Sequence, residues 1–255
     1  MTIHIPLMVL YGFLLVLARV SAFVAFLPVP GFRSAPEPVR AALALGLTLA
    51  LSPFWPRLDS APGMGQLLAW IAGEAAFGLF AGLTVQFMTD GFQTAAQMIG
   101  LQAGYAYAST VDPSSQADSG ILQVILLLGT GVLFFTLGVD RTLLRALALS
   151  LERVPAATWT PATQGLDWIL RLGSGMLLLA LRIAVPVTAV LLVMDLSIAL
   201  LGRMQHQLQL LSLAFPVKML AALAILAALA PVFPRLLSSA VERSVSVLCR
   251  ASGAC

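Results

Sequence analysis

Long apolar stretches follow one another along this chain, and they constrain its fold more than any other feature. They cover approximately Ile5–Leu27, Ala41–Leu51, Gln66–Met88, Ile121–Leu151, Gly173–Leu201 and Val217–Val232. Prolines end several of the stretches, because proline lacks an N–H donor and its ring crowds the preceding residue. We therefore expect an all-α protein built from hydrophobic helices.

The composition indicates that these helices are shielded by lipid, by partner proteins or by both. Hydrophobic residues make up 60% of the 255 residues and charged residues only 10%, whereas charged residues make up about 25% of a typical soluble domain. So few polar side chains cannot cover the surface of a water-soluble protein. The formal net charge is only +3, and Lys and Arg form no cluster that would follow a phosphate backbone, so nucleic-acid binding is not favoured.

Catalytic, cofactor and metal sites are not predicted. His4 and His206 lie far apart in the sequence, and neither has a second histidine or a cysteine nearby to support metal or general-base chemistry. Cys249 and Cys255 stand near the C-terminus without metal-ligand spacing. We expect a protein that is not an enzyme, with two ordinary thiols on a loose tail.

Two observations argue against a simple bundle of six membrane-spanning helices. The stretch Ala41–Leu51 rises only about 17 Å as a helix, whereas a crossing needs about 20 residues. It suits the short leg of a helical hairpin better. Charged residues also lie inside or beside the apolar stretches, and each would cost several kcal/mol facing lipid. They are Arg19, Glu74, Arg182, Asp195, Arg203 and Lys218.

Opposite charges in different apolar stretches suggest two ion pairs, Arg19 with Glu74 and Asp195 with Lys218. A different interpretation takes Pro186, with Arg182 and Asp195 nearby, as a broken helix of a small-solute transporter. These two charges are about 20 Å apart along a straight helix and cannot pair with each other. We prefer the interpretation in which each pairs with a neighbouring helix.

Glycines recur at the spacing that lets helices pack closely. Gly78 and Gly82 form a GxxxG pattern, and so do Gly100 and Gly104. The second pattern lies within the one long polar interruption, Asp90–Gly120. There we expect a short helix over Phe92–Ala103 and then a loop, which at membrane depth is tolerated only in water or lining a cavity.

Several motifs together resemble the FliR/SctT family of type III export-gate proteins, over nearly the whole chain. The first is Ala18-Arg19, followed by Leu27-Pro28-Val29-Pro30-Gly31 and Pro38-Val39-Arg40-Ala41-Ala42-Leu43-Ala44-Leu45. The central ones are Gly100-Leu101-Gln102-Ala103-Gly104 and Val111-Asp112-Pro113. The last are Leu200-Leu201-Gly202-Arg203-Met204-Gln205-His206-Gln207 and Ala214-Phe215-Pro216-Val217-Lys218. The family usually has Asn where Asp195 stands, Ala-Pro at Gln205-His206, and Gly at Ala214.

This resemblance implies a non-enzymatic subunit of the flagellar export gate, in the bacterial inner membrane at the flagellar basal body. The subunit would join FliP and FliQ in a cone of tilted helical hairpins that conducts unfolded flagellar substrates. The switch protein FlhB and the large gate subunit FlhA would be its neighbours. A FliP-like portion would cover residues 1–165 and a FliQ-like portion residues 166–255. The alternatives are the equivalent subunit of a virulence secretion system and, less favoured, a small-solute transporter.

The resemblance also implies a pore plug, in the loop over about residues 104–120. Its predicted residues are Gly104, Tyr105, Ala106, Tyr107, Ala108, Ser109, Thr110, Val111, Asp112 and Pro113. Alternate residues of an extended chain point the same way, so both tyrosine rings could fill one lumen. The charges named above are expected to make contacts between helices or subunits.

Overall fold

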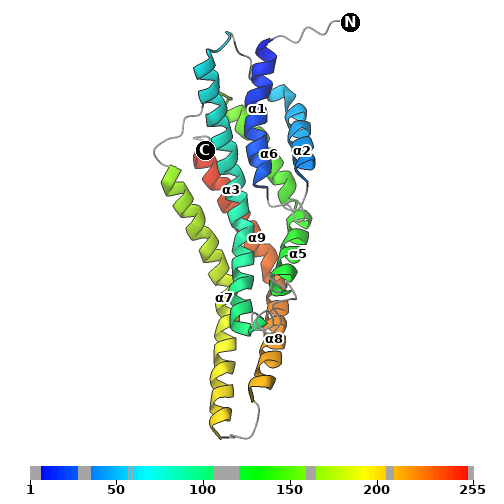
Figure 1. Ribbon diagram of the computed structural model, residues 1–255, viewed down its shortest axis with the longest axis vertical. Helices are drawn as coiled ribbons and strands as arrows, with labels where there is room; N and C mark the ends of the chain where they lie inside the picture. The colour runs from blue at the N-terminus through cyan, green and yellow to red at the C-terminus, as the bar shows by residue number, and fades with distance from the viewer. Residues whose placement is uncertain are drawn as a thin grey trace. The chain divides into compact units, whose positions relative to one another are not determined.

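The computed structural model describes residues 7–27, 36–56, 58, 60–105, 121–158, 165–204 and 210–251 (Figure 1). All regular elements among these residues are helices, which confirms the predicted all-α class. The helices are α1 Leu7–Ala25, α2 Glu37–Ala50, α3 Met64–Ala103, α5 Ile121–Thr136, α6 Val139–Arg153, α7 Gly165–Met204, α8 Leu210–Leu229 and α9 Phe233–Ala251. Short 3-10 turns cover Ser52–Phe54 and Ala230–Val232.

Four helical segments are long and apolar enough to cross a membrane. They are Leu7–Ala25, Met64–Ala103, Ile169–Arg203 and Ala214–Ser246. α5 and α6 are long and apolar enough only when the two are taken together. With 14 residues, α2 is too short for a crossing and packs beside α1, as the sequence predicts (Figure 1). The chain is therefore an integral membrane protein.

The chain forms two compact units that are interleaved in sequence. The first unit comprises Met1–Phe87, Gly138–Gly173 and Val241–Cys255, and the second comprises Met88–Leu137 and Ser174–Ala240. α3, α7 and α9 each contribute residues to both units. The predicted FliP-like and FliQ-like portions are defined by likeness to other subunits, whereas these two units are defined by compactness. The division at residue 165 therefore stays a prediction.

The expected break near Asp90 is wrong, because α3 continues through it as one helix of 40 residues. Phe92, Ala95, Ile99 and Ala103 are all buried and recur at helical spacing. No proline interrupts the segment. The polar residues between them face away from this buried stripe and do not end the helix.

Two further expectations are corrected. The apolar stretch Ile121–Leu151 is two helices, because Gly138 adopts a left-handed conformation with a φ of 65° and starts α6 afresh. The loose tail is instead helix α9, in which Leu237, Ala240 and Val241 form a buried stripe at helical spacing. Cys249 lies in this helix, and Cys255 lies outside the described residues.

Candidate functional site

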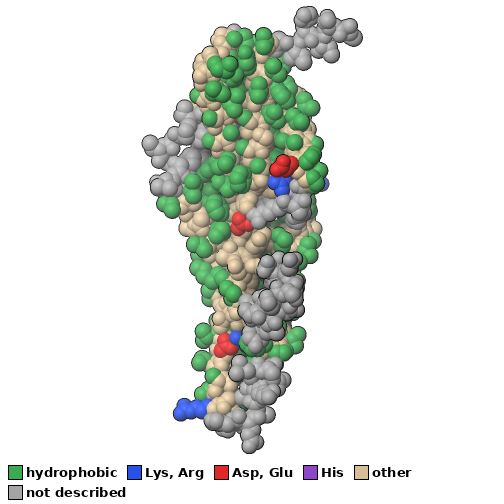
Figure 2. Space-filling model, viewed as in Figure 1, with side chains coloured by type: hydrophobic (Ala, Val, Ile, Leu, Met, Phe, Trp, Pro, Cys, Tyr) green, Lys and Arg blue, Asp and Glu red, His purple; other side chains and the backbone are tan. Residues whose placement is uncertain are grey.

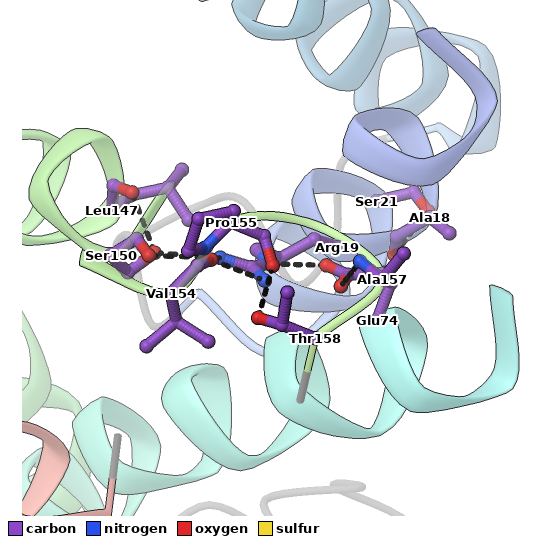
Figure 3. Close-up of polar contacts among 10 residues, drawn as sticks. All are labelled: Ala18, Arg19, Ser21, Glu74, Leu147, Ser150, Val154, Pro155, Ala157 and Thr158. Atoms are coloured by element: carbon purple, nitrogen blue, oxygen red, sulfur yellow. Dashed lines mark hydrogen bonds and ion pairs between the residues drawn. The ribbon is translucent and has the colours of Figure 1, made fainter. Parts of the chain in front are cut away.

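The first polar cluster, in the first unit, is built on Arg19 of α1 and Glu74 of α3 (Figure 3). The two side chains are 0% and 1% exposed, and Arg19 Nε donates a hydrogen bond to Glu74 Oε2. The predicted ion pair is therefore present. Arg19 also lies over the ring of Phe77, 4.5 Å from its centroid, which adds a cation–π contact.

Glycines let α3 approach α1 at this cluster. A Cβ at Gly78 would collide with the backbone carbonyl oxygen of Arg19. One turn later, a Cβ at Gly82 would lie 2.9 Å from the carbonyl oxygen of Phe23. The first GxxxG pattern thus has the predicted packing role. The second does not, because nothing described lies within 4 Å of a Cβ at Gly100 and Gly104 lies beyond the helix.

Arg19 also binds the C-terminal end of α6 (Figure 3). Its Nη1 donates to the carbonyl oxygens of Ser150 at 3.1 Å and Val154 at 3.2 Å, and its Nη2 donates to Val154 at 3.2 Å. The last carbonyls of a helix have no N–H partner within it and carry partial negative charge. One guanidinium therefore neutralises Glu74 and caps a distant helix.

The second oxygen of Glu74 holds the turn that follows α6. Glu74 Oε1 accepts a hydrogen bond from the backbone N–H of Ala157 at 3.0 Å. Ala157 has a φ of 75°, a left-handed conformation that is uncommon for a residue with a Cβ. Among the described residues, no buried side-chain nitrogen or oxygen lacks a hydrogen-bond partner. This cluster is thus a closed structural junction of α1, α3, α6 and the turn after α6.

The second polar cluster, in the second unit, contains the other predicted ion pair. Lys218 Nζ of α8 lies 2.7 Å from Asp195 Oδ1 of α7. Gln102 of α3 donates from Nε2 to Asp195 Oδ2 at 3.0 Å. The Lys218 side chain is 11% exposed but that of Asp195 is 41% exposed. Unlike the first, this cluster is open on one side.

The described start of the predicted plug loop lies against α8. Gly104 has a φ of 88°, and a Cβ there would lie 2.6 Å from Cδ1 of the Phe215 ring. Tyr105 donates its hydroxyl proton to the carbonyl oxygen of Met219 at 3.1 Å, and burial raises the pKa of Tyr105, which keeps that donor protonated. The other predicted plug residues, Ala106 to Pro113, lie outside the described residues.

Arg182 and Arg203 are both exposed on α7 and have no ion-pair partner among the described residues. The preferred interpretation, in which each of these charges pairs with a neighbouring helix, agrees with the ion pair between Asp195 and Lys218 of α8. For Arg182 it stays a prediction. The sequence analysis missed the hydrogen bond from Gln102 and the capping of α6. Gln102 stands out only as a polar position on a helix, and the capping has no local signal in the sequence.

Groups that could hold a metal ion are absent from the part of the chain that the structure describes, where no cluster of three His, Cys, Asp or Glu residues occurs. Both polar clusters instead consist of ion pairs and hydrogen bonds between helices. Such clusters can fix helix positions. They present no activated nucleophile beside a base.

Comparison with known proteins shows a match over residues 10–244 to the family described as bacterial export proteins, family 1. The chain is similar to the flagellar biosynthetic protein FliR of Escherichia coli strain K12, with 30% identity over 216 residues, 84% of this chain and 82% of that protein. It is 28% identical to FliR of Bacillus subtilis strain 168 over 81% of each chain. The Yop proteins translocation protein T of Yersinia pestis is 27% identical over 154 residues, 60% of this chain and 59% of that protein.

Proposed function

The chain belongs to family 1 of the bacterial export proteins, and we propose that it is a subunit of a flagellar type III protein export gate. The observation that carries the proposal is the match to flagellar relatives over most of both chains, 84% and 82% for the Escherichia coli protein. The similarity to the Yop translocation protein covers only 60% of this chain. The flagellar role is therefore favoured over the equivalent role in a virulence system, which is the second candidate.

We infer that the role is structural rather than enzymatic. The buried charges Arg19 and Glu74 are fully used in holding helices together. The long apolar helices fit an integral protein of the bacterial inner membrane, within the flagellar basal body. Neither cluster requires a cofactor.

The partners we propose are FliP and FliQ, arranged with this chain in a cone, and next to them FlhB and FlhA. Apolar side chains cover much of the face seen in Figure 2. Large ones are exposed along α5 and α7, among them Leu128, Phe135, Leu177 and Val193. Exposed apolar area on this scale supports burial against lipid and other subunits. Unfolded flagellar substrates would pass through the assembled channel.

We further propose that the loop after α3 closes this channel. Gly104 and Tyr105 support the idea, because they fix the first residues of the loop against α8. Deleting Tyr105–Ser109 should leave the complex assembled but make liposomes that carry it permeable to ions. A complex that is intact and as tight as the wild type would contradict the plug role. Replacing Tyr107 alone by Ala is the milder companion variant, which keeps the Tyr105 anchor.

The main test is complementation together with co-purification. The chain, produced with FliP and FliQ from the same bacterium, should form a complex of fixed stoichiometry. It should also restore swimming and secretion of flagellar substrates to cells that lack their own FliR. Restoration of virulence secretion but not swimming would favour the second candidate. A monodisperse monomer in detergent that binds neither partner would overturn the proposal and favour a transporter.

A further inference from the structure

Arg182 is an exposed cation in the middle of an apolar helix face. On α7 its neighbours one turn away, Leu178 and Val185, are 44% and 54% exposed. Arg182 has no ion-pair partner among the described residues. A guanidinium on an apolar face at membrane depth is costly unless an anion meets it.

The spacing of charges along α7 means that a membrane crossing by this helix must include a charged residue. Between Arg171 and Arg203 the only charged residues are Arg182 and Asp195, and the longest uncharged run, residues 183–194, has 12 residues. A membrane crossing needs about 20. Any crossing along this helix therefore includes Arg182, Asp195 or both. Asp195 is paired with Lys218, so Arg182 is the charge that has no ion-pair partner among the described residues.

Pro186 adds a hydrogen-bond acceptor at the same place. It lies inside α7, four residues after Arg182. In an α-helix the N–H of residue 186 would bond the carbonyl of residue 182, but proline has no N–H. The same turn of α7 thus presents five guanidinium N–H donors and a carbonyl oxygen released from its α-helical partner.

This combination favours a polypeptide over a lipid. A lipid phosphate can accept from the guanidinium, but the ammonium or hydroxyl donors of lipid headgroups lose their hydration if they move to a carbonyl among apolar side chains. A helix with a carboxylate and a neighbouring hydroxyl or amide group can satisfy both. Small residues allow a close approach, because nothing described lies within 4 Å of a Cβ at Gly175, two turns before Arg182, and Ala189, two turns after it, is exposed.

We propose that Arg182 and the Arg182 carbonyl form an interaction site for an apolar helix of a neighbouring subunit, which carries an Asp or Glu carboxylate at the level of Arg182. The inference rests on the proposed function, because the neighbour is a subunit of the same assembly. The carboxylate pairs with the guanidinium. A hydroxyl or amide beside the carboxylate donates to the carbonyl.

Charge reversal tests the site in the full-length chain produced with its proposed partner subunits. Arg182→Glu places two negative charges together and should lower the recovery of assembled complex at least about tenfold. Arg182→Lys should lower it less, because lysine keeps the charge but loses the planar fork of donors. Arg145→Glu is the control, since it reverses an exposed arginine of α6 that has no expected subunit contact, and it should assemble normally.

Cross-linking then identifies the neighbour with Arg182 intact. A photoreactive amino acid at Leu178 should cross-link to a helix of another subunit, and replacing that helix's acidic residue by Lys should restore assembly with Arg182→Glu. Normal assembly of Arg182→Glu, or cross-links at Leu178 to lipid alone or to nothing, would overturn the site. Failure of the wild-type chain to assemble at all would instead overturn the proposed function.

Discussion

The two ion pairs of this protein differ in how completely the chain encloses them. Arg19 and Glu74 are 0% and 1% exposed, and they also hold the end of α6 and the turn after it. Asp195 is 41% exposed, although its partner Lys218 is buried. A sealed pair that loses one member leaves a buried charge without a partner, whereas the open side of the second pair leaves room for another group to replace the lost one. The two ion pairs have similar chemistry, but we expect the enclosed pair to hold its helices rigidly and the open pair to let its helices shift.

The largest expected effect is that of Glu74→Ala. It leaves Arg19 buried without its anion and removes the acceptor of the Ala157 N–H, so the free energy of unfolding should fall by about 3–5 kcal/mol. Thermal unfolding of the assembled complex in detergent measures the loss. Glu37→Ala, at an exposed position in the first turn of α2, is the control and should change little. Equal effects of the two variants would contradict a sealed junction.

Gly78→Ala should have the next largest effect. Its methyl group would collide with the Arg19 carbonyl and push α3 away from α1, at a cost of about 1–3 kcal/mol. Gly100→Ala in the same helix meets nothing described within 4 Å. It should therefore be neutral or stabilising by up to about 1 kcal/mol, because alanine is the better helix former. Opposite signs in thermal unfolding support the close approach, and equal effects rule it out.

Substitution of Asp195 should have a smaller effect. Asp195→Ala leaves the buried ammonium of Lys218 without its partner, while Asp195→Asn keeps an oxygen that can accept from Lys218. We expect a loss of about 1–2 kcal/mol for Ala and less for Asn. Assembly and export are the readouts. If Asn is as damaging as Ala, the negative charge itself has a role, such as proton or ion coupling.

The smallest expected effect, of opposite sign, is that of Ala157→Gly. The left-handed conformation costs a residue with a Cβ about 1–2 kcal/mol, whereas it costs glycine almost nothing. The variant should raise the free energy of unfolding by up to about 1 kcal/mol, after the extra entropy of glycine in the unfolded chain is counted. Ala156→Gly, one residue earlier and without positive φ, should destabilise instead. A destabilised Ala157→Gly variant would mean that the turn is not strained.

Much of the fold follows from patterns within the sequence. Apolar length predicts the long helices, and the short stretch Ala41–Leu51 predicts that α2 does not cross a membrane. The pairs Arg19–Glu74 and Asp195–Lys218 follow from charge alone, because a charge among apolar residues needs an opposite charge and few are available. The continuation of α3 through Asp90 could have been found too, since Phe92, Ala95 and Ile99 extend its apolar stripe.

Other features depend on tertiary placement and leave no local signal. Nothing near Arg19 in the sequence says that it caps a helix ending at Arg153, because the contact depends on how α1 and α6 pack. The left-handed conformation of Ala157 could not be predicted either, because alanine is not a residue type that indicates a positive φ. The amphipathic α9 was missed for a different reason. Its mixed charges and serines resemble a tail unless the spacing of Leu237, Ala240 and Val241 is counted.

The position of the α6 cap along the chain has a consequence for synthesis at the ribosome. Arg19 is made early, but Glu74 follows 55 residues later and Val154 follows 135 residues later. At a synthesis rate of about 5–20 residues per second, Glu74 is made about 3–11 s after Arg19, and Val154 is made about 7–27 s after Arg19. Until Glu74 is made, the nascent first helix carries a positive charge without its partner carboxylate. A chain that is truncated before Val154 therefore keeps the hydrogen-bonding groups of Arg19 only partly satisfied.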